Sequence, residues 1–119
     1  MAKIGIDIVE NKRISLNEKF LKKFLHKEEI SLLNNLESNE AKLQFASGRW
    51  AAKEALIKCL EKSLKINEIN IIYKKNKPII ENKEFKNIEL SISHEKKYSV
   101  AVVLNLESNL LNKLQNTNN

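Results

Sequence analysis

The sequence predicts an α+β fold in which antiparallel strands pack on one long helix. Apolar residues alternate with others over 3–9, which is the period of a strand. A segment with helical spacing follows over 40–63, and no proline and no glycine except Gly48 interrupts it. Alternating runs separated by turn signals then fill 69–106. Because 119 residues are the size of one domain, we expect a single domain over 1–119.

Two helical regions are expected before these last strands. Residues 17–36 have apolar side chains at helical spacing, and they predict two short helices broken near His26. Ser38 and Asn39 can cap the start of the long helix. One face of that helix carries a stripe of residues expected in the core: Phe45, Ala52, Leu56 and Cys59.

The second half is expected to form strands joined by turns. Asn76-Lys77-Pro78 is a turn signal between two strands, and Glu95-Lys96-Lys97 turns the chain within a final hairpin. The last strand, 98–106, is apolar on both faces, so it is either sandwiched within one subunit or covered on one face by a neighbour. The tail 107–119 is expected to be a short helix or frayed.

Composition places the chain among globular proteins of the cytoplasm. Its apolar fraction of 42% and charged fraction of 30% are ordinary for such a protein. No apolar run approaches the roughly 20 residues of a membrane span, and the acidic, strand-like start is unlike a signal peptide, so we expect no membrane partner. The single cysteine, Cys59, allows no internal disulfide and favours a reducing setting.

The charge distribution points to an anionic partner. The formal net charge is +6, and residues 41–86 carry the whole excess, with eleven basic and five acidic side chains. Such a region attracts nucleic acid, a phosphorylated cofactor or an acidic protein. Only two of the 21 basic residues are arginines, Arg13 and Arg49, so these two positions carry more information than a single lysine does.

Asp7 is the first candidate functional residue, because it stands inside an apolar strand on the face opposite Ile4, Ile6 and Ile8. One interpretation is a solvated residue on the outer face of an edge strand. The other is a metal ligand, since a carboxylate fixed on a strand is a rigid oxygen donor for a hard cation such as Mg²⁺. The residue pattern leaves both interpretations open.

The long helix carries a second group of candidates. Trp50, Glu54 and Lys58 recur every four residues and share one helix face. Glu54 and Lys58 fit an ordinary surface ion pair, worth only about 0.3–0.5 kcal/mol. Arg49 and Lys53 are expected to add two cations around Glu54, and a carboxylate among cations suits a site for a metal and phosphate.

Ser93 and His94 end a predicted strand at a turn. A histidine there is either structural or serves in phosphate binding or proton transfer. The chain has no Gly-x-Ser-x-Gly motif, which argues against a serine hydrolase. With two glycines in all, the chain can form no glycine-rich phosphate loop, so side chains and a metal would have to hold any phosphate.

Three blocks, in this order, resemble the holo-acyl-carrier-protein synthases, the small type of 4′-phosphopantetheinyl transferase. The first is IGIDIVE over 4–10, with Arg13 six positions after the aspartate. The second is the helix motif FASGRWAAKEALIK over 45–58, and the third is LSISHE over 90–95, followed by Tyr98. The resemblance covers residues 2–106 and implies the α+β fold of that family.

The resemblance implies transfer of the 4′-phosphopantetheine arm of coenzyme A to a serine of apo-acyl carrier protein. Adenosine 3′,5′-bisphosphate would be released, and the product would serve fatty acid biosynthesis. One Mg²⁺ would be held by Asp7 and Glu54 together with pyrophosphate oxygens, with Lys58 near the developing charge. The base that takes the serine proton stays open among Glu54, a metal-bound water and His94.

The resemblance also implies binding roles for further residues. Those implied to contact coenzyme A are Arg49 and Lys53 at the nucleotide phosphates, with Lys58, Pro78, Ser93 and His94. Those implied to meet the acidic recognition helix of the carrier protein are Arg13, Lys19 and Lys23. The family's homotrimer would place the sites at subunit boundaries. Two departures concern the adenosine end of coenzyme A: the segment after Cys59 is shortened and lacks glycine, and Asn76 stands where the family favours glycine.

Two other functions compete with the transferase. A non-enzymatic basic module that binds nucleic acid explains the charge of +6, but it does not explain why Asp7 and Glu54 occupy the centre of the positive region. A metal-dependent phosphohydrolase needs more ligands than these two carboxylates. The transferase is therefore the function that we expect, with no nucleic acid among its partners.

Overall fold

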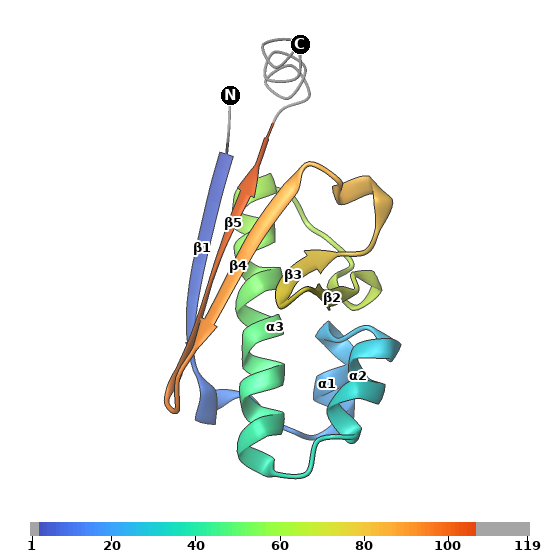
Figure 1. Cartoon of the computed structure of the whole chain (residues 1–119), viewed down its shortest axis with the longest axis vertical. Helices are drawn as coiled ribbons and strands as arrows, with labels where there is room; N and C mark the ends of the chain where they lie inside the picture. The colour runs from blue at the N-terminus through green and yellow to red at the C-terminus, as the bar shows by residue number, and fades with distance from the viewer. Residues whose placement is uncertain (1–2, 107–119) are drawn as a thin grey trace.

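The structure, a computed structural model, describes residues 3–106 of the chain (Figure 1). Its elements are β1 (Lys3–Glu10), α1 (Glu18–Phe24), α2 (Lys27–Asn34), α3 (Asn39–Leu60), β2 (Ile71–Lys74), β3 (Lys77–Ile80), β4 (Ile88–His94) and β5 (Tyr98–Asn105), with 3₁₀ turns at Asn11–Arg13, Ile66–Glu68 and Lys83–Phe85. The tail 107–119, expected as a short helix or frayed end, lies outside the described residues. Within the described part, no helix is long and apolar enough to cross a membrane.

The strands form two antiparallel sheets, which confirms the predicted α+β class. The larger sheet has the order β1-β5-β4, so β1 and β4 are its edges, and β2 and β3 form a separate hairpin. Figure 1 shows α3 lying along one face of the larger sheet, with the α1–α2 pair and the β2–β3 hairpin on the other side of the helix. The long helix is therefore the central element that every other layer touches.

The break between α1 and α2 falls at His26, as the sequence predicts. His26 is the residue that caps α2: its Nδ1 accepts a hydrogen bond from the backbone N–H of Glu28 over 3.1 Å. In return, Oε1 of Glu29 accepts from the backbone N–H of His26 over 2.8 Å. This reciprocal arrangement satisfies two helix N–H groups that would otherwise lack acceptors.

The long helix begins as predicted, because the hydroxyl of Ser38 accepts a hydrogen bond from the N–H of Ala41 over 3.0 Å. It ends at Leu60, three residues before the expected 63. Glu61 there takes a left-handed conformation with φ of 56°, which stops the helix. The predicted core stripe is buried at Ala52, Leu56 and Cys59, whereas Phe45 is only half-buried.

Strand β1 lies directly on α3 because Gly5 has no side chain. A Cβ at Gly5 would stand 2.0 Å from the carbonyl oxygen of Ala55 and 2.8 Å from the backbone nitrogen of Cys59. No other residue type fits this approach, since both neighbours are helix backbone. The contact fixes which face of β1 meets the helix: the face that carries Gly5 and Asp7.

The isoleucines of β1 therefore point away from α3. Ile4, Ile6 and Ile8 are 60–68% exposed, whereas the side chain of Asp7 is 17% exposed. The interpretation of Asp7 as a solvated residue on the outer face is wrong, because the outer face is the isoleucine face. Facing the three isoleucines across the β1–β5 pairing are half-buried residues of β5: Leu104, Val102 and Val100. We call these six aliphatic residues the outer face.

Two turns complete the framework. The final hairpin forms as predicted, with β4 and β5 joined through Glu95-Lys96-Lys97. The β2–β3 turn falls one residue earlier than its signal, at Lys75 and Asn76, which both have positive φ (52° and 64°). Pro78 consequently lies within β3, opposite Tyr73.

Candidate active site

An ion pair joins Asp7 of β1 to Lys58 of α3. The ammonium of Lys58 donates to Oδ1 of Asp7 over 3.0 Å and to the backbone carbonyl of Ile6 over 3.1 Å. Asp7 is largely enclosed, but the side chain of Lys58 is 56% exposed, so solvent and ligands can reach the pair. Asp7 and Lys58 are 51 residues apart in the sequence, and both were predicted to be functional. The structure thus brings these two candidates into contact.

Glu54 stands one helical turn before Lys58 and on the same helix face. It is half-buried, and no other group in residues 3–106 forms a hydrogen bond or ion pair with it. The ordinary surface pair between Glu54 and Lys58, one interpretation of the sequence, is therefore not formed. Lys58 turns to Asp7 instead, which leaves the carboxylate of Glu54 available to a ligand.

The expected cluster of cations around Glu54 is wrong, because Arg49 and Lys53 surround a different carboxylate. Lys53 donates to Oε1 of Glu29 over 2.5 Å and to the carbonyl oxygen of Phe24 over 2.7 Å. Nε of Arg49 donates to Oε2 of Glu29 over 3.3 Å. The exposed fraction is 0% for Glu29 and Lys53 and 6% for Arg49. Glu29 thus lies at the centre of a buried charge cluster between α2 and α3, because its carboxylate contacts both cations.

This burial changes the predicted roles of both cations. Burial lowers the pKa of Lys53 and of Arg49 from their ordinary values, and the negative charge of Glu29 opposes that shift. The ammonium of Lys53 has both its protein acceptors inside the core, so its predicted contact with nucleotide phosphates does not fit this placement. Trp50, another residue of the helix motif, packs against the rings of Phe20 and Phe24.

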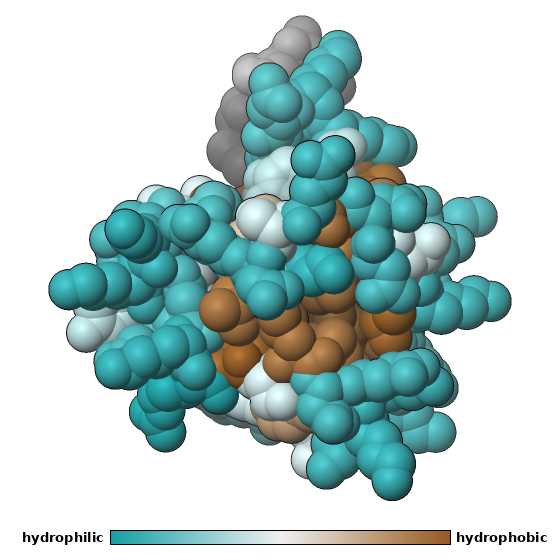
Figure 2. Space-filling view, turned by 90° about the horizontal axis from the view of Figure 1, so that it is seen from below, coloured by the Kyte–Doolittle hydropathy of each residue, from teal (hydrophilic) through white to brown (hydrophobic). Residues whose placement is uncertain are grey.

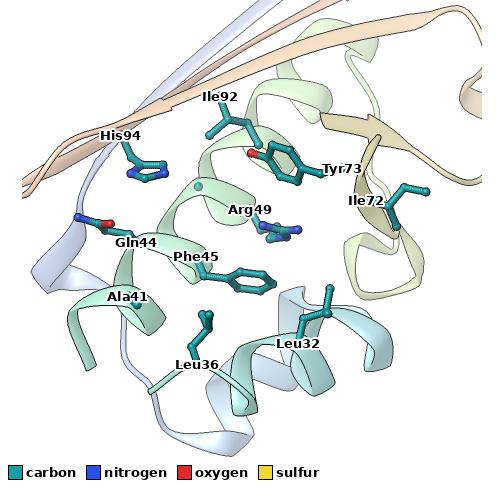
Figure 3. A pocket seen from close by; sticks show the side chains of 11 residues that line it. Leu32, Leu36, Ala41, Gln44, Phe45, Arg49, Ile72, Tyr73, Ile92 and His94 are labelled. Carbon is teal, nitrogen blue, oxygen red and sulfur yellow. The ribbon is translucent and has the colours of Figure 1, made fainter. Parts of the chain in front are cut away.

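Arg49 differs from Lys53 because its guanidinium also reaches a cavity. The cavity has a volume of about 570 Å³ and lies between α2, α3, β2 and β4 (Figure 3). The guanidinium carbon of Arg49 lies 3.8 Å from the centre of the Phe45 ring and 5.5 Å from the centre of the Tyr73 ring. Nη2 donates to the carbonyl oxygen of Ile71 over 3.1 Å. Other lining residues are Leu32, Leu36, Gln44, Gly48, Ile92 and His94.

The structure separates Ser93 from His94. Neighbouring residues of a strand point to opposite faces, and Figure 3 shows His94 beside the cavity, across from Gln44. Ser93 pairs with Val100 and so belongs to the opposite side of the sheet. Pro78, in β3, is not among the residues that line this cavity. Of these three predicted coenzyme A contacts, only His94 lies at the cavity.

Asp7 and His94 lie at opposite edges of the same sheet. Asp7 pairs with Ala101 of the central strand, and Ala101 pairs with Ile92 of β4, so two strand spacings, about 10 Å, separate the two edges. None of Asp7, Glu54 and Lys58 lines the cavity. One chain therefore holds two separate groups of candidate residues, one at each side of α3.

Comparison with known proteins decides which family has this arrangement. The family model described as the 4′-phosphopantetheinyl transferase superfamily matches residues 3–108. The chain belongs to this superfamily. A holo-[acyl-carrier-protein] synthase of Mycoplasma mycoides is 48% identical over 106 residues, 89% of this chain and 96% of the relative. One from Mycoplasma capricolum is 50% identical over 101 residues, 85% of this chain and 91% of the relative.

Solved structures of this transferase family have the same fold. A holo-(acyl-carrier-protein) synthase from Bacillus anthracis, in complex with CoA (3′,5′-ADP), superposes with a TM-score of 0.81 at 32% identity and covers 89% of this chain and 96% of its own. One from Helicobacter pylori, in complex with coenzyme A, has a TM-score of 0.70 at 32% identity, with coverage of 84% and 96%. The chain is thus an enzyme, a transferase of the holo-[acyl-carrier-protein] synthase type.

The donor set of this transferase fits a divalent cation that is shared with a substrate. Within residues 3–106, no group of three or more His, Cys, Asp or Glu side chains could hold a metal without help. Two carboxylates, Asp7 and Glu54, are the usual protein contribution to Mg²⁺, which takes its remaining ligands from water and phosphate oxygens. The open carboxylate of Glu54 suits such a shared site.

The sequence missed Glu29, although one signal could have found it. His26 and Glu29 have the spacing of a capping box, in which the fourth residue turns back toward the helix start. A carboxylate held there is buried whenever the helix packs its first turn against the core.

The remaining predicted residues, Arg13 after β1 and Lys19 and Lys23 on α1, are all exposed.

Proposed function

We propose that the chain transfers 4′-phosphopantetheine from coenzyme A to a serine of apo-acyl carrier protein, releasing adenosine 3′,5′-bisphosphate. The observation that carries the proposal is the arrangement at β1 and α3: an enclosed Asp7 is paired with Lys58, and Glu54, one helical turn before Lys58, has no hydrogen-bond or ion-pair partner within residues 3–106. The relatives at 48–50% identity bear the name of this activity.

Asp7 and Glu54 would hold the Mg²⁺. When bound, that ion neutralises charge on the pyrophosphate and so favours attack on phosphorus. Lys58 is held within hydrogen-bond reach of Asp7 and is more than half exposed, so its ammonium can also donate to a phosphate oxygen of the leaving nucleotide. Glu54, which has no partner among residues 3–106, would also accept the proton of the attacking serine.

The cavity beside Arg49 supports a role in binding the nucleotide phosphates of coenzyme A. The buried cluster holds two cations, Arg49 and Lys53, against one carboxylate, Glu29, so it retains a net positive charge. Arg49 presents that charge at the cavity wall, and His94 stands at the same cavity. An anionic group of the substrate would compensate the charge. In this proposal Lys53 positions Arg49 through Glu29 and touches no phosphate.

We propose a homotrimer in which neighbouring chains share each site. Asp7 and Glu54 lie toward one edge of the sheet and His94 at the other, so a neighbour can place its own His94 near the Asp7 of the first chain. The outer face, with three isoleucines 60–68% exposed, supplies an apolar surface that a closed cyclic assembly would cover. The trimer itself was expected from the family resemblance.

The carrier protein would bind at the lower end of the molecule in Figure 1, where the 3₁₀ turn after β1 lies, and along α1. That turn carries the exposed Arg13, and α1 carries the exposed Lys19 and Lys23. Figure 2 looks at that end and shows an apolar area framed by hydrophilic side chains. Protein interfaces commonly combine an apolar centre with a polar rim. The exposed cations suit an acidic partner, because complementary charges speed and orient the encounter.

One assay tests the proposal. Apo-acyl carrier protein is incubated with the chain, coenzyme A and Mg²⁺, and its mass is measured. A gain of one 4′-phosphopantetheine group supports the transferase, and no gain at saturating substrates overturns it. The competing nucleic-acid-binding module predicts salt-dependent binding of an oligonucleotide that requires neither Mg²⁺ nor coenzyme A.

A further inference from the structure

Asn11, the residue after β1, is a polar side chain buried to 3% exposure in a joint with the β4–β5 hairpin. Its Nδ2 donates to the carbonyl oxygens of Glu95 (2.9 Å) and Lys96 (3.2 Å), and its Oδ1 accepts from the hydroxyl of Ser99 (2.7 Å). Its backbone N–H donates to the carbonyl oxygen of Lys97 over 2.7 Å. The hairpin turn is therefore fixed to the end of β1 by four hydrogen bonds.

This joint gathers cations from two distant parts of the sequence. Figure 1 shows the hairpin tip beside the segment after β1, at the lower end of the molecule. Lys96 and Lys97 share a surface hollow of about 340 Å³ with Lys12, Glu10 and Tyr98. Arg13 follows Asn11 by two residues. Residues 1–40 and 87–119 are each neutral overall, so net charge along the sequence does not reveal that Lys96 and Lys97 lie near Arg13.

Lys12 is paired with Glu10 over 3.3 Å, and the other three cations of this surface, Arg13, Lys96 and Lys97, are available to a partner. Within the described chain, no carboxylate forms an ion pair with Lys96, Lys97 or Arg13. The nearby Glu95 is turned inward, and its Oε1 accepts hydrogen bonds from the backbone N–H groups of Lys97 (2.9 Å) and Tyr98 (2.8 Å). The side chain of Tyr98 is 45% exposed among these cations.

We propose that this surface, made of Lys12, Arg13, Lys96, Lys97 and Tyr98, is a contact site for the acidic carrier protein, with Asn11 as its positioning residue. The inference rests on the proposed function and extends it to the hairpin tip. An exposed aromatic ring surrounded by cations suits an acidic helix that has an apolar side chain at its centre. The hydrogen bonds of Asn11 hold Lys96 and Lys97 of the hairpin at a fixed position relative to Arg13.

The first experiment reverses the charge of the hairpin tip in the full chain. The double variant Lys96→Glu with Lys97→Glu should raise the KM for carrier protein about tenfold and weaken its dependence on salt. The Kd for coenzyme A should stay within about twofold, because neither lysine lies at the cavity or at Asp7. The matched control is the double variant Lys83→Glu with Lys86→Glu, at the distant 3₁₀ turn after β3. It changes the net charge by the same amount and should leave the KM for carrier protein and the Kd for coenzyme A unchanged.

The second experiment tests the joint. Asn11→Ala should raise the KM for carrier protein with little change in kcat, whereas Ser99→Ala, which keeps both bonds to the turn carbonyls, should have a smaller effect. The Kd for coenzyme A reports whether Asn11→Ala remains folded. An unchanged KM for carrier protein in the Lys96 and Lys97 double variant overturns the inference, and so does a rise in KM that is no larger than in the Lys83 and Lys86 control. Weakened oligonucleotide binding together with normal carrier-protein kinetics also overturns it. A wild-type chain without transfer activity would instead overturn the proposed function.

Discussion

Lys53 of α3 donates a hydrogen bond to Glu29 of α2 over 2.5 Å, and neither side chain has exposed surface. The same carboxylate accepts from Arg49 and from the backbone N–H of Ile71 at the start of β2. One carboxylate thus ties two helices and a strand together. A buried pair stabilises little in total, but removing one partner leaves an unpaired charge in the core.

Removing the charge of Glu29 should therefore destabilise the fold strongly. Glu29→Gln leaves two buried cations facing a neutral amide, and we expect the free energy of unfolding to fall by about 3–5 kcal/mol. Urea denaturation measures it. Glu18→Gln, which removes a carboxylate paired with Lys22 on the exposed face of α1, is the control and should change stability by less than about 1 kcal/mol. Equal losses of unfolding free energy in the two variants would show that the buried charge of Glu29 does not stabilise the fold more than a surface carboxylate does.

Asp7→Ala and Glu54→Ala should each abolish transfer while the fold stays intact. Both carboxylates are proposed cation ligands, and losing several kcal/mol of charge stabilisation lowers the rate by about 10²–10³-fold. Glu54→Gln should fail as well, since an amide is a poor ligand for a hard cation. The measurement is the transfer rate as Mg²⁺ is titrated, with circular dichroism as the check on folding. Near-normal activity of either alanine variant at limiting Mg²⁺ would rule out the two-carboxylate site.

The sequence predicted what depends on local spacing and missed what depends on contacts between elements. The helix motif around Glu54 and Lys58 was visible, because residues four apart on a helix share a face. The partner of Lys53 was not, since Glu29 comes from another helix, 24 residues away. For β1, alternation correctly placed Asp7 opposite the isoleucines, but it could not tell which face meets α3. Only the clash that a side chain at Gly5 would cause with Ala55 fixes that choice.

Arg13 should act on the carrier protein and not on coenzyme A. It is exposed at the end of the 3₁₀ turn after β1, away from the cavity. Arg13→Glu should raise the KM for carrier protein by about tenfold and weaken its salt dependence, because a charge at an interface rim mainly affects encounter. Calorimetry should give nearly the wild-type affinity for coenzyme A. A large loss of that affinity would place Arg13 in the coenzyme A site instead.

Cys59 should react slowly with thiol reagents. Its side chain is buried, with Sγ 3.4 Å from the carbonyl oxygen of Lys3, and burial raises the pKa of the thiol. A raised pKa leaves less thiolate at a given pH, so labelling at pH 8 should be at least about tenfold slower than in the urea-unfolded chain. The labelling rate, followed by mass spectrometry, should rise with pH. Equal rates in the folded and unfolded chains would show that Cys59 is accessible.

The exposed isoleucines should hold a trimer together. The outer face offers Ile6 at its centre, paired with Val102 of β5, and a charge placed there would have to be buried on assembly. Light scattering should give about three times the mass of one chain for the wild type. Ile6→Glu should give one chain mass and lose activity, whereas Lys75→Glu, in the exposed β2–β3 turn, should remain trimeric. Full activity of monomeric Ile6→Glu would contradict shared sites.

Shared sites make a sharper prediction for mixed trimers. Asp7 and His94 lie at opposite edges of one sheet, so a working site would take Asp7 from one chain and His94 from its neighbour. Asp7→Ala and His94→Ala chains should each be inactive alone. After mixing and reassembly in equal amounts, about a quarter of the boundaries would combine both intact residues, with a matching return of activity. If each site lay within one chain, no mixture of the two variants could regain activity. The transfer assay on mixed and unmixed variants therefore separates the two arrangements directly.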